Sequence, residues 1–159
     1  FMPSAYNNNI QIFQHKNHIV IMTEMVHDAR VVPLDENHEL HDDVRLWSGD
    51  SKGYWDGDTL VVETKNFSDM VQSFLASPYG NAREKSLTER FTRVNETSVE
   101  YEFTINDPGT FTDRITAMVP MTRVDGLLYE YSCHEGNYGM ENILRGARVE
   151  ERMAAEGEL

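Results

Sequence analysis

The chain has 159 residues, of which 40% are hydrophobic and 10% aromatic, a composition that fits one globular domain with a single core. Its 27 acidic residues outnumber its 14 basic ones, and the resulting net charge of -13 repels nucleic acid and anionic membranes. No stretch approaches the roughly 18 consecutive apolar residues that cross a bilayer. We therefore expect one domain, with no nucleic-acid partner and no membrane span.

The N-terminal part of the chain has the pattern of antiparallel strands. Residues 9–14 and 18–26 are apolar or alternating and are separated by a short polar turn, which predicts a hairpin. Both faces of the second segment are apolar at first, so we expect a central strand. Residues 29–34 predict a third strand that Pro33 brings to an end, because proline removes a backbone donor. Residues 35–43 form a charged loop.

The clearest strand–turn–strand signal lies in residues 47–67. Asp56-Gly57 suits the positive φ angles of a tight hairpin turn, and the β-branched run after it predicts a strand. We expect residues 49–53 to form a turn before this hairpin. Residues 66–85 are weakly patterned, and loops of that length in compact domains are usually functional.

The second half of the chain alternates more sharply, and we expect residues 99–105 to turn Val99, Tyr101, Phe103 and Ile105 toward the core. Turn signals at residues 106–109 and at Asp125-Gly126 separate the strands. Four strands are predicted, at residues 87–94, 99–105, 114–121 and 127–133. The whole pattern predicts an all-β antiparallel meander of eight or nine strands, which forms a barrel-like domain similar to calycins.

After Gly136 the apolar period becomes helical. Residues 139–153 predict an α-helix that Asn137 caps and that frays beyond Val149. Its apolar stripe consists of Met140, Ile143, Leu144 and Ala147. We expect this stripe to cover one side or end of the sheet, within a single domain that spans residues 1–159.

Six motifs resemble those of a large family of uncharacterised exported proteins from acidobacteria and proteobacteria. They are PSAYNNNIQIFQ at the start, EMVHDARVVPLD (24–35), WSGDSKGYWDGDTLVVETKNF (47–67), ERFTRV (89–94), YEFTINDP (101–108) and YEYSCHEGNYGMENILRGAR (129–148). The resemblance covers nearly all of the chain. Two positions depart from the family's pattern: Glu39 and Ser86 stand where the family tends to have histidine.

The resemblance implies a periplasmic or extracellular protein. Family members are longer at the N-terminus, where they carry a secretory signal and a cysteine, so the resemblance implies that Cys133, the single cysteine of this chain, pairs with a cysteine upstream. Phe1 and the residues after it also read like a loop entered midway, so we expect further residues before it.

Chemistry-bearing residues gather in two segments, and we interpret four of them as catalytic and four as ligand-binding. The predicted catalytic residues are His27, Arg30, Glu130 and His134, and the predicted ligand-binding residues are Asp28, Glu89, Glu135 and Asn137. Histidine exchanges protons near neutral pH and arginine stabilises an anionic intermediate, so the first set suits enolisation, elimination or hydrolysis. No cofactor is needed for such chemistry, and none is expected.

Two alternatives stay open at these residues. A divalent metal is one, held by His27, His134 and a carboxylate, although the spacing carries no recognised ligand motif and no metal is predicted. The other is purely structural: Tyr129, Tyr131 and Cys133 form the core face of their strand, which turns Glu130 and His134 to water. Glu89, on an apolar face, requires a partner such as Arg114 or a ligand.

The sequence thus predicts an exported domain that binds a small molecule, with histidine–carboxylate acid–base chemistry of the lyase, isomerase or hydrolase type. The alternative is a non-catalytic structural or assembly module that binds another protein chain, which includes an N-terminal segment upstream of residue 1.

Overall fold

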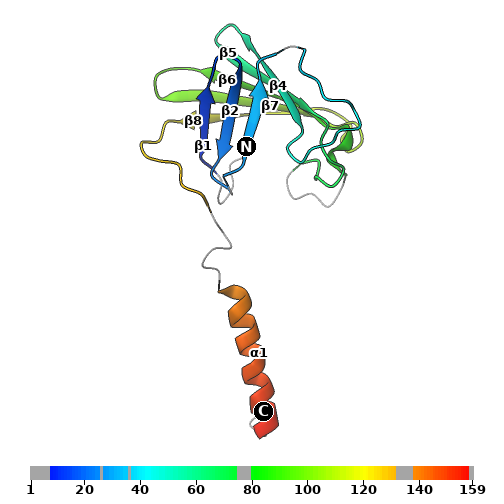
Figure 1. Ribbon diagram of the computed structural model, residues 1–159, viewed down its shortest axis with the longest axis vertical. Helices are drawn as coiled ribbons and strands as arrows, with labels where there is room; N and C mark the ends of the chain where they lie inside the picture. Colours follow the sequence, from blue (N-terminus) through cyan, green and yellow to red (C-terminus); the bar gives the residue numbers. More distant parts are fainter. Residues whose placement is uncertain (1–7, 26, 36, 75–79, 132–137, 158–159) are drawn as a thin grey trace.

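The computed structural model describes residues 8–25, 27–35, 37–74, 80–131 and 138–157. Within these residues the chain forms eight β-strands, one 3-10 helix and one C-terminal α-helix (Figure 1). The strands are β1 (Ile10–Gln14), β2 (His18–Thr23), β3 (Ala29–Pro33), β4 (Asp50–Asp56), β5 (Thr59–Lys65), β6 (Ser86–Arg93), β7 (Ser98–Asn106) and β8 (Ile115–Thr122). The helices are η1 (Ala82–Glu84) and α1 (Gly139–Glu156).

The strands follow one another in chain order, as the predicted meander requires, but they form two antiparallel sheets. The first sheet has the order β1-β2-β3, so β2 is central, and the second has the order β4-β5-β6-β7-β8. Every named pairing is antiparallel, which confirms the meander. The two sheets are joined where β3 lies beside β4. No closed barrel is present in the part of the chain that the structure describes, because β1 and β8 each pair on one side only.

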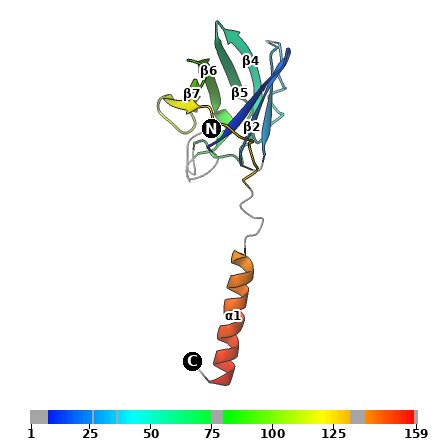
Figure 2. The ribbon, with the colours of Figure 1, turned by 90° about the vertical axis from the view of Figure 1, so that its left-hand side faces the viewer.

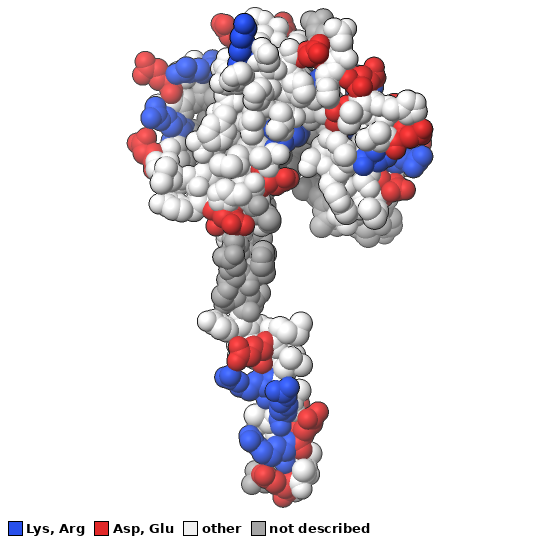
Figure 3. Space-filling view, in the orientation of Figure 1, with Lys and Arg blue, Asp and Glu red and all other residues white. Residues whose placement is uncertain are grey.

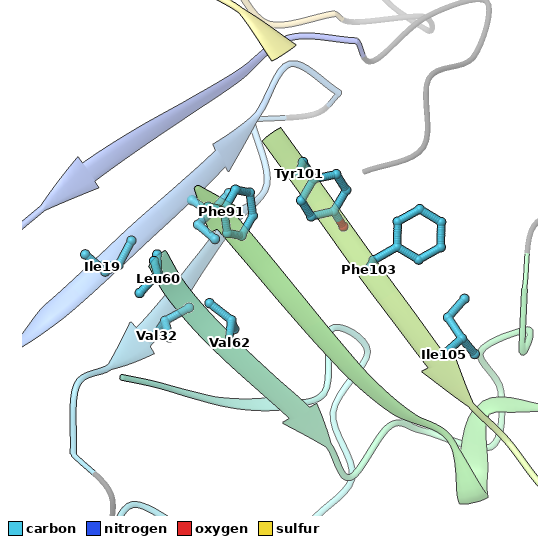
Figure 4. Close-up of a cluster of buried hydrophobic side chains, with 9 residues drawn as sticks. Ile19, Val32, Leu60, Val62, Phe91, Tyr101, Phe103 and Ile105 are labelled. Atoms are coloured by element: carbon cyan, nitrogen blue, oxygen red, sulfur yellow. The ribbon is translucent and has the colours of Figure 1, made fainter. Parts of the chain in front are cut away.

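The core lies between the two sheets. Ile19, Ile21 and Val32 come from the first sheet, and they pack on six buried side chains of the second (Figure 4). Those six are Leu60, Val62, Phe91, Tyr101, Phe103 and Ile105. The alternation along β7 is the one predicted, with its apolar side chains in the core and the side chains between them more exposed.

The hairpin between β4 and β5 has a two-residue connection. Asp56 pairs with Thr59, and Gly57 between them has a φ of 60°, the left-handed conformation that the sequence predicts there. The strand before the turn is longer than predicted. It begins at Asp50, so Asp50 to Gly53 belong to β4 and not to a turn.

Two predicted features at the C-terminal end are wrong. Among the described residues of the predicted strand 127–133, only Tyr131 pairs, through one isolated parallel bridge to Met25. Helix α1 is longer than predicted and ends where Gly157 adopts a φ of 76°. It buries none of its described residues, and both views draw it away from the sheets (Figures 1 and 2). The apolar stripe therefore does not cover the sheet.

The surface is charged but mixed in sign. Acidic and basic side chains alternate along α1 and around the margin of the sheets on the face that Figure 3 shows. Among the described helices, none is long and apolar enough to span a membrane.

Candidate functional site

Two segments that lie far apart in the sequence meet beyond the end of β2. The N–H of Tyr131 donates a hydrogen bond of 2.7 Å to the carbonyl oxygen of Glu24, and Met25 bridges Tyr131. This contact brings the neighbourhood of His27 to that of Glu130. The alternation of apolar and polar residues within either segment does not predict this contact.

His27 and Glu130 face each other across a short gap. The His27 Nδ1 atom lies 3.9 Å from Oε2 of Glu130, and the two side chains are 35% and 41% exposed. Nδ1 itself is buried and has no hydrogen-bond partner among the described residues. The backbone of His27 has a φ of 49°, which costs free energy for a residue with a Cβ and recurs at functional sites.

Arg30 points in another direction, into the core. Its guanidinium lies 2.6 Å from the carboxylate of Glu89 on β6, and the Tyr101 hydroxyl on β7 donates a 2.8 Å hydrogen bond to the same carboxylate. Glu89 is 1% exposed and Arg30 is 12% exposed. These three side chains, the buried triad, therefore join the two sheets through the core.

The buried triad corrects two expectations. Glu89 pairs with Arg30 and not with Arg114, whose backbone N–H donates a hydrogen bond to the side chain of its neighbour Asp113. Arg30 neutralises a buried carboxylate, which differs from the anion-stabilising role predicted for it. Burial, and then the charge of Glu89, raise the pKa of Tyr101, so its hydroxyl stays protonated and remains a donor.

The remaining predicted residues divide into two groups. Asp28 lies on the surface near Ser48, whose hydroxyl is 3.5 Å from the Asp28 carboxylate, and it does not join Arg30. His134, Glu135 and Asn137 lie outside the described residues, as does Cys133. The expected core face at Tyr129 and Tyr131 is wrong, because both side chains are exposed.

Two further histidines each lie beside a carboxylate, and the two carboxylates differ. His38 lies 2.8 Å from Asp50, and His41 lies 3.3 Å from Asp43. Within the described ranges, no group of three histidine, cysteine or acidic side chains is arranged to hold a metal ion.

The structure contains a buried polar cluster that the sequence did not predict. The Ser73 hydroxyl donates a hydrogen bond to the Asp107 carboxylate. The ammonium of Lys85 donates to the Ser73 carbonyl oxygen at 3.2 Å. The same ammonium lies 4.2 Å from the centre of the Phe67 ring. Burial lowers the pKa of Lys85, and Asp107 opposes this effect. Asp107 belongs to a turn motif, so its sequence signal indicates only a turn.

A groove of about 820 Å³ separates the two sheets on the side opposite their junction. One wall is residues 8–12, which include β1, and the other is the end of β8 with residues 123–129 after it. Glu24 also lines the groove. Figure 1 draws β1 and β8 on this same side of the molecule, and Figure 2 turns that side toward the viewer.

Comparisons of the chain with protein-family models, with curated proteins and with solved structures find no match. The family resemblance of the sequence motifs therefore stays a prediction.

Proposed function

We propose that this chain is an exported β domain that binds a small molecule beside His27 and Glu130, which exchange protons with it. The observation that carries the proposal is the gap of 3.9 Å between the buried Nδ1 atom of His27 and the carboxylate of Glu130. The gap is too long for a hydrogen bond, so the imidazole and the carboxylate are not bonded to each other, and a small shift of either side chain lets a ligand hydroxyl contact both.

Two further features support an acid–base pair here. Histidine is the side chain whose charge changes most readily near neutral pH, and a carboxylate is the natural partner for the proton it gives or takes. The strained backbone at His27 holds the imidazole in place, since Tyr131 fixes the neighbouring segment by its 2.7 Å hydrogen bond to Glu24. The reaction classes that such a pair serves include elimination, isomerisation and hydrolysis.

In this proposal the two sheets are the two halves of a calycin-like barrel that stays open. The buried triad joins the two sheets through the core, and a ligand beside His27 contacts the rim of that core. Arg30 then acts as a positioning residue. Its ion pair with Glu89 fixes the start of β3, which follows His27 in the chain, and its charge does not contact the ligand.

The test is a fragment screen by two-dimensional amide NMR on the folded chain and on matched variants. His27→Gln and Glu130→Gln keep volume and hydrogen bonding but remove titration. His41→Gln is the control, because His41 also lies beside a carboxylate, Asp43 at 3.3 Å, but fully on the surface.

We expect fragments with a carbonyl or hydroxyl group to shift the amides of residues 24–30 and 129–131. Their affinity should fall by about tenfold, or about 1.4 kcal/mol, in each site variant and stay unchanged in the control. Fragments that bind both site variants as tightly as the wild type, or a screen without any hit at these amides, contradict the proposal.

The second candidate function is assembly with another protein chain, and helix α1 favours it. Met140, Ile143 and Leu144 are all exposed on this 18-residue helix, and an amphipathic helix owes most of its stability to burial of its apolar face. If α1 is an assembly element, Ile143→Lys should abolish association in sedimentation while the sheet stays folded. Sedimentation as a monomer at every concentration and with every candidate partner contradicts this function.

A further inference from the structure

The two strands beside the groove, β1 and β8, carry no charge. Neither the sequence IQIFQ of β1 nor the sequence ITAMVPMT of β8 contains a charged residue, although 26% of the chain is charged. Ile10, Val119 and Met121 form an apolar floor that continues the core. The charged residues that line the groove have partners within the chain: Glu24 accepts from the backbone N–H of Asn9 at 3.2 Å, and Arg123 lies 3.6 Å from Asp125.

The rim of the groove exposes large apolar side chains. Leu127 is 78% exposed and Tyr129 is 74% exposed, and Val124 and Ile12 are exposed beside them. A contiguous set of exposed apolar residues around a concave surface is typical of a protein-interaction site.

The outer edge of β1 offers backbone groups to this groove. The Glu24 N–H donates to the Asn9 carbonyl oxygen at 3.1 Å, and the His15 N–H donates to the His18 carbonyl oxygen at 3.0 Å. Because bonded and non-bonded pairs alternate along an antiparallel ladder, Ile10, Ile12 and Gln14 direct their N–H and C=O groups away from β2. In the part of the chain that the structure describes, no other strand pairs with this edge.

The facing edge of β8 is protected. The Arg123 N–H donates to Thr97 at 2.7 Å, so the same alternation directs the backbone groups of Met118, Pro120 and Thr122 away from β7. Proline has no N–H, and its position on an outer edge is a known device against strand addition. One wall of the groove therefore accepts a strand, and the other discourages one.

We propose that the groove binds an extended, uncharged strand of another protein, which pairs its backbone with β1 at Ile10, Ile12 and Gln14. Alternate side chains of this strand lie on the apolar floor, which gives the site its specificity, as in other cases of strand addition. The uncharged strands β1 and β8 match an uncharged strand, and the charges of Glu24 and Arg123 are paired within the chain. A second copy of this chain is disfavoured as the occupant, because it would bring a further net charge of -13. This inference is independent of the small-molecule site at His27.

The test is selection of a random displayed-peptide library on the folded chain, followed by affinity measurement of the synthetic peptides on variants. Ile12→Pro removes an outward N–H of β1, at an edge position where proline is tolerated. Met118→Pro is the matched control, because it removes an outward N–H of β8. Leu127→Lys places a charge on the rim, at a side chain so exposed that the fold does not depend on it.

We expect peptides with alternating apolar residues and no charge to be selected. Their affinity should fall by at least about tenfold in Ile12→Pro and in Leu127→Lys and stay the same in Met118→Pro. Selection of charged peptides, full binding to Leu127→Lys, or loss in Met118→Pro alone overturns the proposal. It is also overturned by a wild-type chain that dimerises through β1, or by backbone NOEs that pair residues 127–131 of the same chain with β1. If Ile12→Pro does not fold, the Leu127→Lys result decides.

Discussion

The ion pair between Arg30 and Glu89 permits the sharpest energetic prediction. Arg30→Met keeps the length of the side chain but removes its charge, so Glu89, 1% exposed, loses the cation with which it pairs and keeps the Tyr101 hydroxyl. Breaking a buried pair by removing one partner costs about 3–5 kcal/mol, because an uncompensated charge stays buried. This is a large share of the roughly 5–15 kcal/mol by which a domain is stable.

Two matched changes separate the cost of leaving a buried charge unpaired from the loss of an ion pair in itself. The double variant Arg30→Met with Glu89→Gln removes both charges while the amide still accepts from Tyr101, and it should recover most of the lost stability. Arg90 and Asp56 form a pair with a similar distance, 2.8 Å, on the surface. Arg90→Met should cost no more than about 1 kcal/mol, since exposed pairs are screened by solvent.

The assay is urea denaturation of all four proteins. The free energies of unfolding are compared with one shared m-value, the slope of the free energy against urea concentration. A loss below about 1 kcal/mol in Arg30→Met, as for a surface pair, would refute the reasoning. So would a double variant as unstable as the single one.

Three further predictions concern the triad and two glycines. Tyr101→Phe should cost about 1–3 kcal/mol at neutral pH because Glu89 loses a donor. Since burial raises the pKa of Tyr101 in the folded state, its contribution is complete below the unfolded value of about 10 and is lost as the pH rises above that value. Stability curves against pH should therefore fall more steeply above pH 10 for the wild type than for Tyr101→Phe, and parallel curves contradict this. Gly57→Ala should cost about 1–2 kcal/mol from its positive φ alone, because nothing lies within 4 Å of the added Cβ; unchanged stability in urea contradicts the turn. Gly49→Ala should cost more than Gly57→Ala, because its Cβ would lie 2.8 Å from the Lys65 carbonyl oxygen in addition to the strain of a φ of 71°, and equal losses contradict the crowding.

The strands were predictable where their signal is local. Alternation of apolar residues identifies β7 and its core face, and a glycine suited to positive φ identifies the hairpin after β4. These features depend on residues within a few positions of each other, so a single sequence is enough to predict them.

The failures depend on contacts between distant segments. The segment from Leu127 has the composition of a strand, but a strand forms only beside a partner, and Tyr131 meets Met25 through one bridge. Amphipathicity indicates which face of α1 is apolar without indicating what covers it. The partner of Glu89 was missed for the same reason, because Arg30 comes from the other sheet.

The candidate site was predictable in its residue types and not in its geometry. Histidine and carboxylate in two separate segments indicate acid–base chemistry, whereas the gap between His27 and Glu130 depends on the contact of Tyr131 with Glu24. Arg30 lies next to this site in the sequence, but its charge is used in the core.

The most direct test of the proposed acid–base pair is a double-mutant cycle on ligand affinity with His27→Gln and Glu130→Gln. If one ligand group bridges both side chains, either single variant removes the bridge, so the double variant should bind as weakly as each single variant. Strictly additive losses in the double variant, or no loss in either single variant, would show that His27 and Glu130 do not act on the same ligand and would contradict the account.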